Sequence, residues 1–215
     1  LLRKRARPKV LLATCYDEAI ETYRRYETNI IGVISDIGFV LHKGDPSSTE
    51  KLDAGIDLCR LIRKENPTMP FLMQSSQEAM SSIAKQLKVG FVVKTSKTLT
   101  QELSAYIERE FGFGDFVAID PRSGKEIARA SDLEAFERVI STISSAAFRR
   151  LSDNNYLSKW LFARGLFAIG RHVQQLQIQD DTDIENIRLT NIRLIHDYRI
   201  NQALGVVARY SPQTY

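Results

Sequence analysis

The first half of the chain alternates short apolar runs with amphipathic helical patterns. Four runs rich in apolar and β-branched residues are too short for helices, and they predict strands near 9–15, 30–35, 71–75 and 89–93. After each run, apolar residues recur at three- and four-residue intervals, which predicts helices that begin near Tyr16, Leu52, Ala79 and Leu99. Strands that alternate with helices build parallel, helix-covered sheets. The sequence therefore predicts an α/β domain over residues 1–111.

The second half is predicted to be a mostly helical connector, residues 112–215. The runs FVAID and KEIARA flank the turn sequence PRSG and predict a β-hairpin. A helix is expected after the capping residue Asp132, and a continuous apolar helix over 156–173. Trp160 and Phe167 would share one face of that helix. A third long helix follows the acidic run at 180–183, and VVARY near the end predicts a further strand.

Chemistry-bearing residues stand at the ends of the predicted strands. Right-handed crossovers bring the carboxyl ends of parallel strands to one edge of the sheet, where α/β proteins place their sites. That edge would collect Cys15, Asp36, Ser75 and Lys94. A carboxylate nucleophile, a hydroxyl donor and an ammonium clamp are the groups needed to accept a phosphoryl group. Taken singly, each residue is equally typical of an ordinary strand end, and only the combination predicts a phosphate pocket.

Three segments that contain these residues resemble the response-regulator receiver family. They are VISD with Asp36, PFLMQSS with Ser75 and GFVVKTS with Lys94, and the resemblance covers about residues 9–111. It implies a flavodoxin-like parallel sheet in which Asp36 is the phosphoacceptor and Ser75 and Lys94 contact the phosphate. A sensor kinase would be the partner. Two features depart from the family: Thr95 replaces a proline, and the acidic pair that holds Mg²⁺ after the first strand is missing.

The order of the elements accounts for the missing acids. In the family the phosphoacceptor ends the third strand, whereas Asp36 ends the second predicted strand here. We therefore expect a receiver-like sheet without its first strand, which would lie upstream of Leu1. Asp36 would then bind a metal only if upstream acids were present; Mg²⁺ is an expectation for a longer parent protein, and no cofactor is expected in this chain. The unpaired edges at 9–15 and 30–35 predict self-association.

A second resemblance concerns residues 111–215. The segments FGFGDFVAIDPRSGKEIARASDL, NNYLSKWLFAR and GVVARYSPQTY resemble the linker of multidomain proteins that carry a pyruvate phosphate dikinase-type, phosphoenolpyruvate/pyruvate-binding module, such as phosphoenolpyruvate synthases. The resemblance implies an ATP-grasp-type module downstream of Tyr215. The expected role of this chain is regulatory and signal-receiving, not enzymatic. The alternative is a degenerate pseudo-receiver that serves only as a dimerisation or structural adaptor.

Charge and composition narrow the partners. The formal net charge is +4, but residues 1–9 contribute five basic side chains and no acid, so the remainder sums to −1. A basic arm on a near-neutral body does not favour nucleic acid as the partner. The two cysteines and three histidines lack the spacing of a zinc site. The low number of cysteines favours a reducing cytoplasm as the compartment. No apolar run reaches the ~18 residues of a membrane span.

Overall fold

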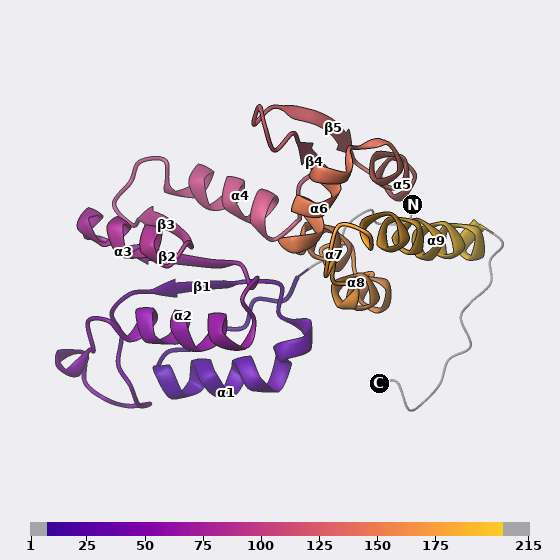
Figure 1. The fold of residues 1–215 in the computed structure, drawn as a ribbon. Coiled ribbons are helices and arrows are strands. Elements are labelled where there is room, and N and C mark those ends of the chain that lie inside the picture. Colours follow the sequence, from indigo (N-terminus) through magenta and orange to yellow (C-terminus); the bar gives the residue numbers. More distant parts are fainter. Residues whose placement is uncertain (1–7, 204–215) are drawn as a thin grey trace. The chain divides into compact units, whose positions relative to one another are not determined.

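A computed structural model describes residues 8–203, which form two compact units, residues 8–113 and 114–203. The first unit is α/β and contains a three-stranded parallel sheet in the order β1-β2-β3 (Figure 1). Its strands are β1 (Val33–Asp36), β2 (Phe71–Ser75) and β3 (Gly90–Val93). Its helices are α1 (Tyr16–Tyr26), α2 (Ala54–Glu65), α3 (Ser81–Gln86) and α4 (Leu99–Glu110), with short 3-10 turns at Glu27–Asn29, Ser47–Thr49 and Glu78–Met80. The parallel pairing of three predicted strands is confirmed.

Alternate residues of β2 face two different layers of helices. Phe71 and Met73 are buried in a cluster that includes residues of α1, α2 and α3. Leu72, between them, points to the opposite face, where its side chain and the ring of Tyr106 from α4 close over Gly90. A Cβ at Gly90 would lie 2.2 Å from that ring, so only glycine permits this approach. The sheet is thus covered by helices on both faces.

The predicted strand at 9–15 is wrong. Residues 8–14 carry no strand pairing, and most of their side chains are exposed. Cys15 is instead the residue before α1, where it is buried. A strand exists only where a neighbouring strand supplies hydrogen-bond partners, and among the described residues no strand pairs beside this apolar run. The sheet therefore has three strands where the sequence predicted four.

The second unit combines the predicted hairpin with helices. Strands β4 (Phe116–Ile119) and β5 (Glu126–Ala130) pair antiparallel. As predicted, the Asp132 carboxylate accepts a hydrogen bond from the Ala135 N–H at 2.9 Å and caps the following helix. The helices are α5 (Leu133–Thr142), α6 (Ser145–Asp153), α7 (Tyr156–Phe162), α8 (Phe167–Gln175) and α9 (Ile184–Ala203). The core centres on Trp160, which stacks on Phe136 with ring centroids 4.4 Å apart.

The continuous helix predicted over 156–173 is also wrong, because the chain turns between α7 and α8. Gly165 adopts a φ of 76°, a left-handed conformation that glycine accepts without strain. Trp160 and Phe167 consequently lie on different helices, and Phe167 stacks on Phe162 of α7 instead. Helix α6 was not predicted; the Ser144 hydroxyl caps it by accepting from the Ala147 N–H. The strand predicted at VVARY lies outside the described residues.

Candidate functional site

The carboxyl ends of the three parallel strands place a polar cluster on one face of the sheet. In the strand register, Asp36 pairs with Gln74, and Gln74 pairs with Val92. Residues paired across a sheet share a face, and side chains alternate along each strand. Lys94, two residues beyond Val92, returns to the same face. The register therefore aligns Asp36, Gln74 and Lys94.

The Asp36 carboxylate is held by two protein donors. Lys94 Nζ lies 2.6 Å from one carboxylate oxygen, Oδ2. Gln74 Nε2 donates to the other oxygen, Oδ1, also at 2.6 Å. The side chains of Asp36 and Lys94 are each 38% exposed, so the ion pair remains open to water. Each carboxylate oxygen thus has one protein donor, which an incoming group could displace.

Ser75 takes no part in this cluster. Its hydroxyl accepts a hydrogen bond from the Gln77 backbone N–H at 3.1 Å, and among the described residues it makes no hydrogen bond to Asp36 or Lys94. Ser75 pairs with Val93 in the register, and because side chains alternate along a strand, its side chain lies on the opposite face of the sheet from that of Gln74. Gln74 was not among the predicted site residues, because a phosphate pocket predicts a hydroxyl at this strand end. The alternation of side chains along β2 was the signal that could have identified the amide of Gln74.

Helix α2 begins against the backbone of Asp36. The Gly55 N–H donates to the Ile37 carbonyl at 2.8 Å, and a Cβ on Gly55 would lie 2.0 Å from the Asp36 carbonyl oxygen. That oxygen accepts a further hydrogen bond from the Ser35 hydroxyl at 2.8 Å. Only glycine fits at position 55. The end of β1 and the start of α2 are therefore in rigid contact, and a displacement of one must move the other.

The loop between β1 and α2 is also attached to the start of α1. The backbone N–H groups of Tyr16 and Asp17 donate to the carbonyls of Val40 and Leu41 at 3.1 and 3.2 Å. The Asp17 carboxylate lies 2.7 Å from His42 Nδ1, and this hydrogen bond raises the pKa of His42. Position 40 follows the end of β1, so these contacts bring the start of α1 to the same end of the sheet as Asp36.

The residues around Asp36 do not fit a divalent cation such as Mg²⁺. Hard cations take several oxygen ligands, usually from more than one carboxylate. Within residues 8–203, no three His, Cys, Asp or Glu side chains are grouped so that they could hold a metal ion. At Asp36 the nearest charged neighbour is an ammonium, which repels a cation.

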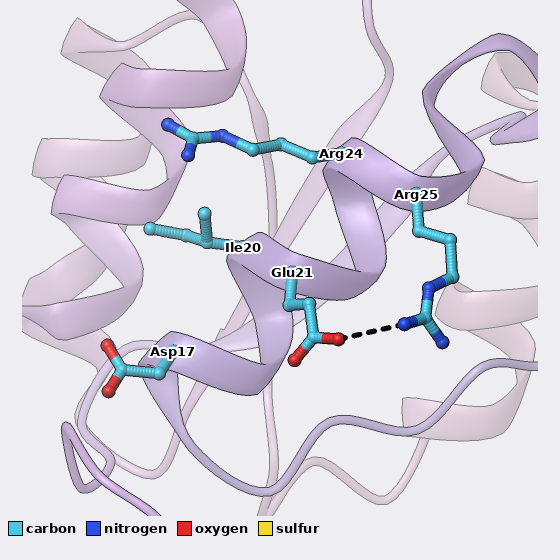
Figure 2. A pocket seen from close by; sticks show the side chains of 5 residues that line it. All are labelled: Asp17, Ile20, Glu21, Arg24 and Arg25. Carbon is cyan, nitrogen blue, oxygen red and sulfur yellow. Dashed lines mark hydrogen bonds and ion pairs between the residues drawn. The ribbon is translucent and has the colours of Figure 1, made fainter.

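A shallow hollow on α1 is not part of this site. Figure 2 shows that its lining comes from one helix, with Asp17, Ile20 and Arg24 on one side and Glu21 paired with Arg25 on the other. The Glu21–Arg25 contact of 3.0 Å joins successive turns of an exposed helix face. Surface pairs of this kind contribute little energy. The mixed charges do not converge on a common point, so the hollow offers no catalytic or binding geometry.

Comparisons of the chain with protein-family models, with curated proteins and with solved structures found no match. Of the helices in the part of the chain that the structure describes, none combines the length and the apolar character needed to cross a membrane. The function of the chain must therefore be inferred from the residues at the Asp36 edge.

Proposed function

We propose that the α/β unit is a regulatory, signal-receiving domain, similar to a response-regulator receiver, and that it is not itself an enzyme. The observation that supports this proposal is the contact of 2.6 Å between Lys94 and Asp36 at the carboxyl edge of the parallel sheet. The pair is accessible, and each partner stands at the end of a strand that continues into a loop and then a helix. A change of charge at Asp36 is thus positioned to alter two connecting segments.

The response follows from the contacts of the pair. A phosphoryl group on Asp36 would convert the carboxylate into an acyl phosphate, so that the carboxylate loses its own charge and the phosphoryl group carries roughly −1.5 to −2 charges on three new oxygens near neutral pH. The Lys94 ammonium would leave the carboxylate for the new oxygens, and Gln74 would lose its acceptor. The segment 94–98 leads into α4, and the loop 37–53 leads into α2 through the close contact at Gly55. These two segments would carry the signal.

The two protein donors to Asp36 favour a second candidate, a degenerate pseudo-receiver that acts as a structural or dimerisation adaptor. Both carboxylate oxygens already accept hydrogen bonds, from Lys94 and Gln74. As such an adaptor, the unit would use the ion pair only to hold β1 and β3 together across β2, and the loop 37–53 and the segment 94–98 would not respond to the charge on Asp36.

The helical unit would connect this domain to a module that uses ATP. The support is the resemblance of residues 111–215 to the linker of phosphoenolpyruvate synthase-like proteins. In that setting a cytoplasmic parent protein would contain the catalytic residues, and the α/β unit would influence them through the connector.

Hydrogen exchange measured by mass spectrometry separates the two candidates. Asp36→Asn and Lys94→Met should each accelerate amide exchange in 37–53 and 94–98, because each removes one side of the ion pair. Glu50→Gln is the control, since Glu50 lies in the same loop and is exposed, with no resolved ion pair. Unchanged exchange in both segments for both variants would reject a signal-receiving edge and leave the structural adaptor.

Reaction with a phosphoryl donor tests the chemistry separately. Because the described residues place no second carboxylate beside Asp36, acetyl phosphate with Mg²⁺ should leave the intact mass of the chain unchanged. Stoichiometric phosphorylation of the wild type, absent in Asp36→Asn, would contradict that expectation while strengthening the receiver assignment.

A further inference from the structure

The α/β unit leaves two apolar surfaces exposed. The first is the segment 9–13, in which Val10, Leu11 and Leu12 are 90%, 48% and 79% exposed. The second is the outer edge of β1, where Ile34 is 42% exposed although its strand belongs to the sheet. Exposed apolar side chains that are neighbours in sequence or lie along a strand edge mark interaction surfaces.

The backbone of β1 has unused hydrogen-bonding capacity on that edge. The N–H groups of Val33 and Ile37 donate toward β2, to the carbonyls of Pro70 and Gln74 at 2.9 and 3.3 Å. Since peptide groups alternate along a strand, Ile34 directs its N–H and C=O away from β2. Within residues 8–203 no strand pairs on this side of β1. The edge can therefore accept an added strand.

The segment 9–13 has the properties of such a strand. Its sequence, KVLLA, contains one charge and no proline, and Cys15, two residues beyond its end, has extended backbone angles with φ −147° and ψ 170°. In Figure 1 it precedes α1 and runs in the same general direction as β1 without joining the sheet. It lacks only the hydrogen-bond partners that an open edge supplies.

We infer that these two surfaces bind each other between two copies of this chain. The segment 9–13 of each copy adds to the outer edge of β1 in the other copy, so that the contact is reciprocal and two-fold symmetric. Such exchange is an inexpensive route to a dimer, because both surfaces already exist on every chain. The inference does not depend on the chemistry of Asp36.

The area favours a second copy over a small foreign peptide. At roughly 100 Å² for a fully exposed aliphatic side chain, the exposed parts of Val10, Leu11, Leu12 and Ile34 amount to on the order of 500 Å² over two copies. The two added backbones increase this area toward the ~1,000 Å² that a specific interface needs. A single peptide would cover only one edge and less than half of the surface. The dimer should be weak and concentration-dependent, in the micromolar range.

Sedimentation velocity of the 215-residue chain tests the inference. Over about 1–200 µM, the wild type should shift from monomer to dimer. Val10→Asp combined with Leu12→Asp, and separately Ile34→Lys, should remain monomeric throughout. Leu52→Lys is the matched control, because Leu52 is 75% exposed but lies outside both surfaces. Far-UV circular dichroism establishes whether each variant is folded. If Ile34→Lys does not fold, Ile34→Pro takes its place, because proline removes only an N–H group that points away from β2.

Mixing the two kinds of variant tests reciprocity. A fluorescently labelled Val10→Asp/Leu12→Asp chain retains an intact edge, and Ile34→Lys retains an intact segment, so their mixture recovers one of the two contacts. Energy transfer between differently labelled variants should therefore exceed that of either variant with itself. A monomeric wild type at all concentrations, whether its edge is open or filled by its own segment, overturns the inference. So does dimerisation that survives both variants or is abolished by Leu52→Lys.

Discussion

Two cations, one from each unit, have contrasting surroundings: Lys94 lies at the open edge of the sheet, and Arg188 lies inside the helical unit. Lys94 meets one carboxylate, and both side chains are 38% exposed. The Arg188 residue is 6% exposed, and its Nη1 donates to the carbonyls of Ile143 and Ile140 at 2.5 and 3.3 Å, while Nη2 approaches Ser145 and Glu185. The guanidinium thus binds carbonyls at the end of α5 that would otherwise be unpaired. A buried guanidinium that donates to two carbonyls holds backbone segments together, whereas an exposed ammonium can change partners.

The substitution Arg188→Met tests this contrast most directly, and we expect it to cause the largest loss in the free energy of unfolding. The substitution replaces the guanidinium by an apolar side chain and leaves the carbonyls of Ile140 and Ile143 without this donor, and each buried polar group left unpaired costs about 1–3 kcal/mol. Trp160 is the only tryptophan and lies in the same unit, so its fluorescence during urea unfolding reports that unit. Arg193→Met on the exposed side of α9 should change the free energy of unfolding by less than ~0.5 kcal/mol. Equal losses in the two variants would remove the distinction.

Gly55→Ala should cause the next largest loss in the free energy of unfolding. It also tests whether the packing of α2 affects the residues at the Asp36 edge. A Cβ would overlap the Asp36 carbonyl oxygen, and overpacking against backbone costs about 1–3 kcal/mol. Gly38→Ala is the control in the same loop, because its Cβ would make only ordinary contacts of 3.6–3.8 Å. Far-UV circular dichroism in urea measures both losses, and nuclear magnetic resonance shifts of Asp36 and Lys94 should move only in Gly55→Ala. Unperturbed shifts would mean that α2 and the edge are not coupled.

The exposed ion pair itself should contribute little. A double-mutant cycle of Asp36→Asn and Lys94→Met should give a coupling free energy of about 0.2–1 kcal/mol at low salt, and less in 1 M NaCl, because water and ions screen a pair at 38% exposure. A coupling as large as the loss in Arg188→Met would place Lys94 with the structural cations and weaken the case for a responsive edge.

The smallest effect on stability is expected from an exposed contact, that of His42 with Asp17. The pKa of His42 is raised chiefly by its hydrogen bond to Asp17 and less by the charge of Asp45. A raised folded-state pKa means that the pair contributes stability below the unfolded pKa of ~6.5, and that the contribution is lost as pH rises through the folded pKa. Titration of the imidazole by nuclear magnetic resonance should show a larger fall in pKa for Asp17→Asn than for Asp45→Asn. The reverse order would show that Asp17 does not anchor the loop.

The sequence correctly predicted the elements that depend on the local pattern of apolar residues. The predictions failed for elements that depend on a partner elsewhere in the chain. The apolar runs of β1, β2 and β3 and the capping residue Asp132 could be read directly. Segment 9–13 has an equally apolar pattern, but no adjacent strand pairs with it, and pairing is invisible in a single run of residues. The break at Gly165 was hidden because apolar residues continue across it. Helix α6 was missed although Ser144 gave a usable capping signal.

The sequence predicted the kind of site but not all of the residues that form it. Strand-end positions correctly brought Asp36 and Lys94 to one edge, because parallel topology imposes that meeting. Gln74 and Ser75 are neighbours in sequence, and only the register of β2 against β1 determines which of them lies beside the carboxylate. Register is a property of two strands together, so residue type alone could not identify the amide.

The strand order β1-β2-β3 follows the order of synthesis, and this has a consequence for how the protein is made. Each new strand can dock beside the one before it as soon as its crossover helix has left the ribosome, so the sheet grows in one direction. Of the three strands, β1 is made first, so its outer side exists before β2 and β3 have been added. Nascent chains on the same messenger RNA would meet through this edge before either is finished, so assembly could begin during translation.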